Sequence, residues 1–202
     1  MAYEDEKIIQ MMNIYKAELH EDIYAGMYMK GELLKFQKEY LFDNNMSIML
    51  PESFIDMPEE MIKIKYLMEQ RPKIIKTNEA YSVNFTFNLL PVDLVNEQVS
   101  YLLNIFQNTI KSTQPSYIFY EKKVEQLALF TLGWFDFKSH GVDAKIYNMM
   151  YCLPVAGKVM HGVFNCPMAE AELWKPCALQ VMHSIEDLTI EKMEQEAGSD
   201  ER

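Results

Sequence analysis

The segment at residues 82–90, SVNFTFNLL, alternates polar and apolar side chains almost one for one. A period of two is the pattern of a β-strand whose two faces meet different surroundings, because successive side chains point to opposite sides of a sheet. The run KIIKT precedes it, and the four residues between the two runs have the length of a hairpin loop. The alternation therefore predicts an antiparallel sheet, since strands of a parallel βαβ sheet are apolar on both faces.

The other elements follow from the same kind of reading. Apolar side chains at three- and four-residue steps predict helices at residues 5–24, 93–113 and 170–184, and a short helix through Met61 and Ile64. Asp93 is the expected cap of the long central helix. Eight strands are predicted, at residues 33–42, 46–50, 73–77, 82–90, 117–124, 127–139, 144–153 and 158–166. Hairpin-connected strands with helices between them predict an α+β fold, a mainly antiparallel β-sheet flanked by helices.

Length and charge divide the chain into three parts. The 202 residues suffice for one core, and the net charge of −11 is concentrated at the two ends. We therefore predict an N-terminal amphipathic helix extension at residues 1–30, a single α+β domain at 31–186 and an acidic flexible tail at 187–202. The absence of a basic patch argues against nucleic acid as a partner. No apolar run is long enough to insert into a membrane, and the acidic N-terminus does not resemble a signal peptide, so we expect a cytoplasmic location.

Three cysteines are the first candidates for chemistry: Cys152, Cys166 and Cys177. None of them forms the short CxxC spacing that suits zinc or thiol–disulfide chemistry. Free cysteines are usually small apolar core residues, and we expect that role here. The alternative is a nucleophilic thiol that uses His161 or His183 as its base.

Histidines and carboxylates show no ligand pattern either. The four histidines are His20, His140, His161 and His183. Asp136 and His140 are four residues apart, but in a strand and turn this spacing does not present two ligands as a helix would. The acidic pairs at residues 59–60 and 186–187 are expected to be helix caps and solvated surface, and no glycine-rich phosphate loop occurs. The sequence thus predicts no catalytic residue, no metal site and no cofactor.

Methionine and tyrosine are unusually frequent, with 16 and 12 copies. They gather at residues 27–29 (MYM) and 147–151 (YNMMY). A methionine-rich core is the expected explanation, and an adaptable binding surface is the alternative.

The stretch at residues 165–177, NCPMAEAELWKPC, is predicted to join a strand to the last helix. Pro167 ends the strand, and Trp174 and Cys177 are spaced to share one helix face against the sheet. Pro176 is tolerated in the first turn of a helix, so the regular helix is expected to begin near Lys175.

Several of these segments together resemble the PsbP-like fold superfamily. They are MSIMLPESF, VNFTFNLL, GWFDFKSHGVDAKIYNMMYCLP, KVMHGVFNCP and LWKPCALQVMHSI. The superfamily includes the extrinsic PsbP subunit of the photosynthetic oxygen-evolving complex, a Ran-GTPase-binding nuclear import factor and bacterial domains. The resemblance spans about residues 40–185 and implies an α/β/α sandwich, to which the N-terminal helix is an addition. It also implies a bacterial protein that binds other proteins or supports a complex, without a shared set of catalytic residues.

The leading functional prediction is therefore a non-enzymatic protein-binding or accessory domain. The N-terminal helix is the expected interaction element, either packing on its own domain or pairing two subunits into a homo-oligomer. The alternative is an enzyme or small-molecule binder with a pocket beneath the long helix or beside the YNMMY strand.

Overall fold

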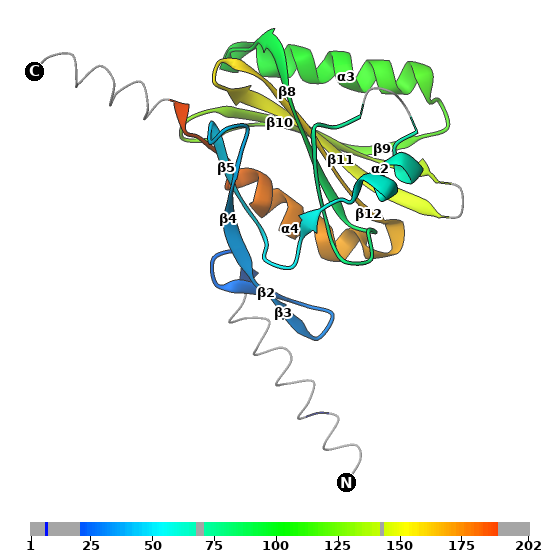
Figure 1. The fold of residues 1–202 in the computed structure, drawn as a ribbon. Helices are drawn as coiled ribbons and strands as arrows, with labels where there is room; N and C mark the ends of the chain where they lie inside the picture. The colour runs from blue at the N-terminus through cyan, green and yellow to red at the C-terminus, as the bar shows by residue number, and fades with distance from the viewer. Residues whose placement is uncertain (1–6, 8–20, 68–70, 142–143, 190–202) are drawn as a thin grey trace, which may run out of the picture.

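The computed structural model describes residues 7, 21–67, 71–141 and 144–189. Its centre is a seven-stranded antiparallel sheet, shown in Figure 1. From one edge to the other, its strands are β6 (Ile55–Asp56), β7 (Ile74–Thr77), β8 (Asn84–Asp93), β12 (Lys158–Pro167), β11 (Lys145–Val155), β10 (Thr131–His140) and β9 (Ile118–Gln126). The predicted α+β class is confirmed, and seven of the eight predicted strands lie within a few residues of their predicted positions. The strand predicted at residues 33–42 is instead two strands in different sheets, β3 (Glu32–Leu34) and β4 (Phe36–Leu41).

The alternating segment forms β8, with Phe85 and Phe87 fully buried on one face. Its polar face is buried as well, which differs from the prediction. Asn84 accepts a hydrogen bond from Thr77 Oγ1 (2.6 Å) and donates one to Asn165 Oδ1 (2.8 Å) on the neighbouring strand. Hydrogen bonding across strands satisfies these polar groups, so they can lie away from water.

One face of the sheet is covered by α3 (Val99–Thr113), which a short 3₁₀ turn, η1 (Asn96–Gln98), precedes. Val99 and Leu103 of α3 pack against Phe135. The helix begins six residues later than predicted, because β8 runs on to Asp93. The Asp93 carboxylate then pairs with Lys158 (2.5 Å) and does not cap the helix.

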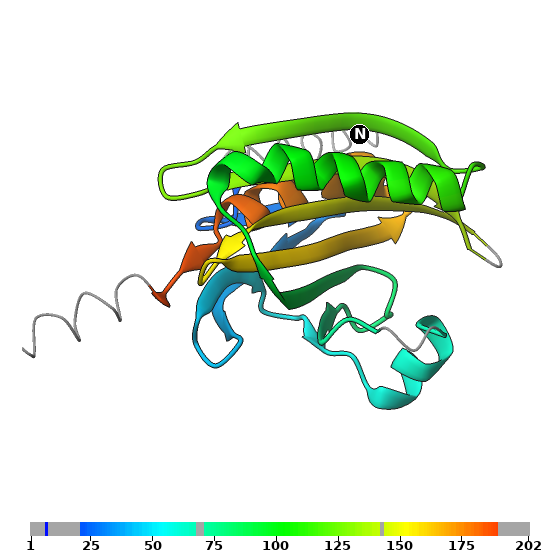
Figure 2. The ribbon, with the colours of Figure 1, turned by 90° about the horizontal axis from the view of Figure 1, so that it is seen from above.

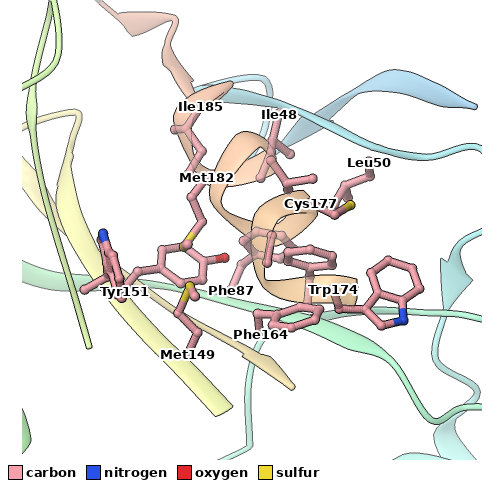
Figure 3. Packing of buried hydrophobic residues seen from close by; sticks show 14 of the residues in the cluster. Ile48, Leu50, Phe87, Met149, Tyr151, Phe164, Trp174, Cys177, Met182 and Ile185 are labelled. Atoms are coloured by element: carbon pink, nitrogen blue, oxygen red, sulfur yellow. The ribbon is translucent and has the colours of Figure 1, made fainter. Parts of the chain in front are cut away.

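The other face is covered by α4 (Ala171–His183), which follows η2 (Met168–Glu170), and by a second sheet. That sheet has the order β13 (Glu186–Asp187), β5 (Met46–Pro51) and β4 (Phe36–Leu41). In Figure 1, α3 and α4 lie on opposite sides of the large sheet, which is the α/β/α arrangement. Figure 3 shows Trp174 and Cys177 of α4 pointing into the core beside Phe164, on one face as predicted.

The structure differs from two predictions about the C-terminal part. Pro176 lies inside α4, which already begins at Ala171, and its side chain is exposed. Glu186 and Asp187 are half-exposed, as a solvated surface would be, but they form strand β13 and their carboxylates are hydrogen-bonded. The Glu186 carboxylate accepts hydrogen bonds from Lys38 Nζ (2.7 Å) and Ser47 Oγ (2.8 Å), and these contacts fasten β13 to the small sheet.

The N-terminal part contains a third small sheet of β1 (Glu21–Asp22), β2 (Gly26–Met29) and β3 (Glu32–Leu34). The predicted helix at residues 5–24 lies mostly outside the described residues. Its last four residues are a strand and a turn, where Asp22 Oδ1 accepts hydrogen bonds from two backbone N–H groups. The short helix predicted through Met61 is α2 (Glu59–Lys65). The division into an extension, a domain and a tail stays a prediction.

Gly162 of β12 is closely packed between Tyr151 and the Thr86 backbone. A Cβ atom there would lie 2.6 Å from the Thr86 carbonyl oxygen and closer still to the buried Tyr151 ring. We expect Gly162→Ala to lower the free energy of unfolding by about 1–3 kcal/mol, because the strands and the ring must separate to admit a methyl group. Chemical denaturation measures this change, and an unaltered midpoint would show that the ring moves freely.

Candidate functional site

A buried carboxylate holds together the polar groups at the β9 side of the sheet. Asp136 of β10 is 1% exposed and lies on the α4 face. It accepts hydrogen bonds from the Glu121 backbone N–H (2.6 Å), the Tyr147 hydroxyl (2.8 Å) and Lys175 Nζ (2.7 Å). Lys175 Nζ also lies 3.1 Å from the Glu121 carboxylate. The lysine therefore ties α4 to β9 and β10.

A β-bulge places two further side chains at this cluster. The pairing of β9 with β10 is regular up to Lys122 and resumes at Phe119, so Tyr120 and Glu121 together oppose the single residue Asp136. Both side chains line an open hollow of about 550 Å³. Pro176 and Leu179 of α4 are among the residues that form the rest of its wall. The hollow is thus mainly apolar, with an ion pair at its floor.

The electrostatics of the cluster keep its protons in place. Burial by itself would lower the Lys175 pKa, but the hydrogen bonds to Asp136 and Glu121 outweigh burial and raise it. Burial and the hydrogen bond to Asp136 raise the Tyr147 pKa well above its ordinary value. At neutral pH the lysine is therefore an ammonium and the tyrosine a neutral phenol. Neither is ready to act as a base or a nucleophile.

The three cysteines are buried and unpaired. Burial raises the pKa of each thiol to about 12. The strand register places Cys152 opposite His161. This position is what the alternative hypothesis, a nucleophilic thiol with a histidine as its base, requires. However, burial lowers the His161 pKa to about 4, so both groups are neutral near pH 7 and no thiolate–imidazolium pair forms.

The other histidines lie apart from one another. His140 is exposed at the end of β10, and four residues of strand separate it from Asp136 by about 13 Å, too far for one metal ion. His183 Nε2 lies 2.7 Å from Glu125. His20 lies outside the described residues. Within the described ranges, no group of three or more His, Cys, Asp or Glu side chains is arranged to hold a metal ion.

His161 is the one side chain whose buried polar atom, Nε2, has no hydrogen-bond partner among the described residues. Its ring lies 5.0 Å from the Phe106 ring of α3, measured between centroids. Since the folded pKa is about 4 and the ordinary value 6.5, the unfolded chain binds a proton in this interval that the folded chain does not. The stability that the neutral ring contributes is therefore complete above pH 6.5 and is lost as the pH falls towards 4.

We expect His161→Phe to remove this pH dependence. Between about pH 7 and about pH 4.5, the wild type should lose about 2.5 kcal/mol more unfolding free energy than the variant. Denaturant titrations at both pH values measure the difference, and the exposed His140→Gln serves as the control. Equal losses in all three proteins would contradict the assignment.

The methionine- and tyrosine-rich run at residues 147–151 lies in the core. Tyr147, Met149 and Tyr151 are buried on the α4 face, and Met150 is buried on the α3 face. In the run at residues 27–29, Met29 is buried and its two neighbours are half-buried. The core explanation holds for the tyrosines and methionines of YNMMY, which are buried, although Tyr147 also lines the hollow beside Lys175.

The sequence reading missed two features that the fold assembles. In the Asp136 cluster, Tyr147 and Lys175 lie 11 and 39 positions from Asp136, so no short sequence motif predicts the cluster. The second feature is the edge position of β9, a strand that was itself predicted at residues 117–124; it lies along the outer edge of the sheet beside α3 in Figure 2. Its alternation is weak because nearly all its side chains are exposed or half-exposed.

The fold is that of PsbP-like proteins: an antiparallel sheet between helical layers. Among solved structures, the chain is similar to cyanobacterial PsbP (CyanoP) from Synechocystis sp. PCC 6803. The TM-score is 0.58 at 8% sequence identity, over 79% of this chain and 96% of that one. It is also similar to a protein from Bacteroides thetaiotaomicron VPI-5482, with a TM-score of 0.51 at 8% identity, over 75% of this chain and 48% of the other. At these identities the likeness shows the fold alone.

Sequence comparisons add nothing to this result, because no family model and no curated protein matches the chain. In the described part of the chain, no helix combines the length and apolar character that a membrane span needs.

Proposed function

We propose that this chain is a non-enzymatic protein-binding or accessory domain that binds through β9. The observation that carries the proposal is the position of this strand. β9 is nine residues long and has β10 as its one neighbour in the large sheet. No other strand among the described residues pairs with its outer side, so its outer backbone groups could pair with an extended segment of another chain, as in β-strand addition.

Apolar side chains along β9 would add affinity to the backbone hydrogen bonds. Ile118, Tyr120 and Val124 are 46%, 49% and 44% exposed. A monomeric protein usually protects such an edge, because it also favours unwanted association. The proposal explains why three apolar groups remain exposed along one strand.

The protonation states support binding over catalysis. Burial makes the cysteine thiols poor nucleophiles, and Lys175 and Tyr147 retain their protons at neutral pH. The resemblance to PsbP-like proteins implies the same class of function. The proposal includes a bacterial source and a cytoplasmic location. Unpaired cysteines favour the cytoplasmic location.

Affinity capture from a native host lysate tests the role of β9. We expect a partner that the wild type captures and that Val124→Asp loses, because the new charge must be desolvated at the paired edge. Ile64→Asp, at an exposed position of α2, is the matched control and should capture the partner normally. A purified partner that binds all three proteins with equal affinity would overturn the proposal.

The pairing role predicted for the N-terminal helix stays a proposal with its own test. Ile23 is buried, and its backbone N–H donates to Gln180 Oε1 (3.1 Å), so a truncation should stop at residue 20 to spare the fold. If the full chain is a dimer in solution and the truncated protein is a monomer, pairing through this segment is supported. An unchanged number of subunits contradicts it.

Small-molecule binding is the second candidate, and the hollow beside Lys175 is the observation that favours it. Its volume of about 550 Å³ is within the usual range of ligand sites, and an ion pair at the floor could orient a polar ligand. A ligand screen by thermal shift, repeated with Lys175→Met, would identify compounds that depend on this hollow.

A further inference from the structure

We infer that β9 pairs with β9 of a second copy of this chain, antiparallel and with a two-fold axis at Val124. The inference rests on the proposed function of β9 as a binding edge and names the partner of that edge. Two antiparallel copies of one strand form an isologous contact, in which each pair of residues occurs twice. The result is one continuous sheet through both copies.

The bulge limits which part of β9 can pair regularly. Tyr120 and Glu121 form the bulge, whereas β9 matches β10 residue by residue from Lys122 to Gln126. A straight pairing of two copies therefore uses the five residues KKVEQ. In an antiparallel pair, residues directly opposite each other lie on the same face of the sheet, and residues on one face of a strand are an even number of positions apart. A two-fold axis perpendicular to the sheet therefore passes through a residue and not between two residues.

Charge selects the position of the axis. An axis at Lys122 or Lys123 places identical lysines opposite each other, and an axis at Glu125 opposes two glutamates. Like charges directly opposite each other destabilise a strand pair. An axis at Gln126, the last residue of the strand, leaves most of each segment without a partner.

An axis at Val124 has none of these faults. It places Val124 opposite its own copy, Lys123 opposite Glu125 and Lys122 opposite Gln126. The two-fold axis repeats the Lys–Glu pair on both sides of the central apolar contact. Aliphatic and opposite-charge pairs of this kind each stabilise neighbouring strands.

The lysines do not block the edge, although lysine at an edge strand commonly prevents association. Lys122 Nζ donates to Asn104 Oδ1 of α3, so this side chain lies over the α3 face. Lys123 Nζ lies 5.6 Å from the centre of the Trp134 ring on the opposite face. Both side chains are folded onto the faces of their own sheet, and no strand in the described ranges pairs with the outer backbone of β9.

Solution mass as a function of concentration is the first measurement. A five-residue strand pair is smaller than a standard interface, so we expect a weak dimer that dissociates on dilution. Sedimentation equilibrium up to about 1 mM protein should show a monomer–dimer equilibrium. A wild type that stays monomeric over this range overturns the inference.

Two charge reversals then test the register. Lys123→Glu and Glu125→Lys each oppose like charges in a homodimer, and each should raise the dimer Kd by about tenfold or more. Mixed together, the two variants place a Lys opposite a Glu at both sites, so the mixture should form heterodimers at the wild-type level. Lys73→Glu, an exposed reversal away from the edge, is the control and should dimerise normally. A dimer that both reversals leave unchanged overturns the register.

Glu125 also accepts a hydrogen bond from Trp134 Nε1 (3.0 Å), so a variant at this position could fold poorly. Val124→Cys provides a second test, because the axis brings two copies of this position within disulfide reach. Mild oxidation should yield a covalent dimer of Val124→Cys and none of Leu129→Cys, an exposed position in the β9–β10 loop. Equal cross-linking of the two variants contradicts the pairing.

The outcomes separate this inference from the proposed function. If the wild type is monomeric but Val124→Asp loses a different captured protein, the self-pairing is wrong and the binding edge stands. If Val124→Asp changes neither the solution mass nor the capture of any partner, both are wrong.

Discussion

Replacing Trp174 with alanine should lower the free energy of unfolding by about 3–5 kcal/mol. Trp174 is 8% exposed, and its ring centroid lies 6.1 Å from that of Phe54 and 6.2 Å from that of Phe164. Alanine would leave a cavity where α4, the loop after β5 and the large sheet meet. The Trp174 indole N–H also donates a hydrogen bond to Glu170 Oε2 (3.1 Å), which alanine would remove.

Urea denaturation of the wild type, Trp174→Ala and Trp174→Phe measures this effect. Phenylalanine fills part of the cavity, so Trp174→Phe should lose less than half of the stability that Trp174→Ala loses. Tyr101→Ala, on the exposed side of α3, is the control and should change stability by about 0.5 kcal/mol or less. A loss at Trp174 no larger than at Tyr101 would mean that the tryptophan does not anchor α4.

Removing the Asp136 carboxylate has the second large expected effect. Asp136→Ala should cost about 3 kcal/mol, because it leaves three hydrogen-bond donors without their acceptor. This cost should be near the low end of the range for breaking a buried ion pair, since Lys175 keeps some exposure and has a second partner in Glu121. The β9 bulge should also loosen, because the Glu121 backbone N–H loses its acceptor.

A double-mutant cycle with Lys175→Met isolates the pair. We expect the double variant to lose about 1 kcal/mol less than the sum of the two single losses. The Lys158–Asp93 pair is the matched control, because both side chains are exposed and such pairs contribute about 0.5 kcal/mol or less. Additive losses at Asp136 and Lys175 would contradict the coupling. Amide hydrogen exchange in β9 reports separately on the bulge.

Much of the fold could be predicted because the signals are local. Alternation in β8 and the glycine turn between β11 and β12 depend on neighbours a few residues away. The turn is an example: Ala156 and Gly157 both have positive φ (53° and 66°), which suits glycine at a tight hairpin. Local rules also explain one error, because Asp93 is a good helix cap in isolation and is taken by Lys158 only in the folded sheet.

The candidate site could not be predicted, because it depends on register. A shift of β9 by one residue would turn Glu121 to the other face, and no short motif records the observed alignment. The same is true of β13, whose two residues resemble a solvated tail until Ser47 and Lys38 lie beside them. Pro176 shows the opposite case, in which tertiary packing of α4 overrides a local preference.

The sequence by itself determined the class of this protein: an α+β domain with an antiparallel sheet, a long covering helix and three cysteines suited to the core. These properties follow from periodicity and composition, which act over one strand or one helix turn. The tertiary structure alone decided which strand became the exposed edge, and which lysine reached Asp136. Both depend on contacts between residues far apart in the chain, whose energies exist only once the sheet has its order and register.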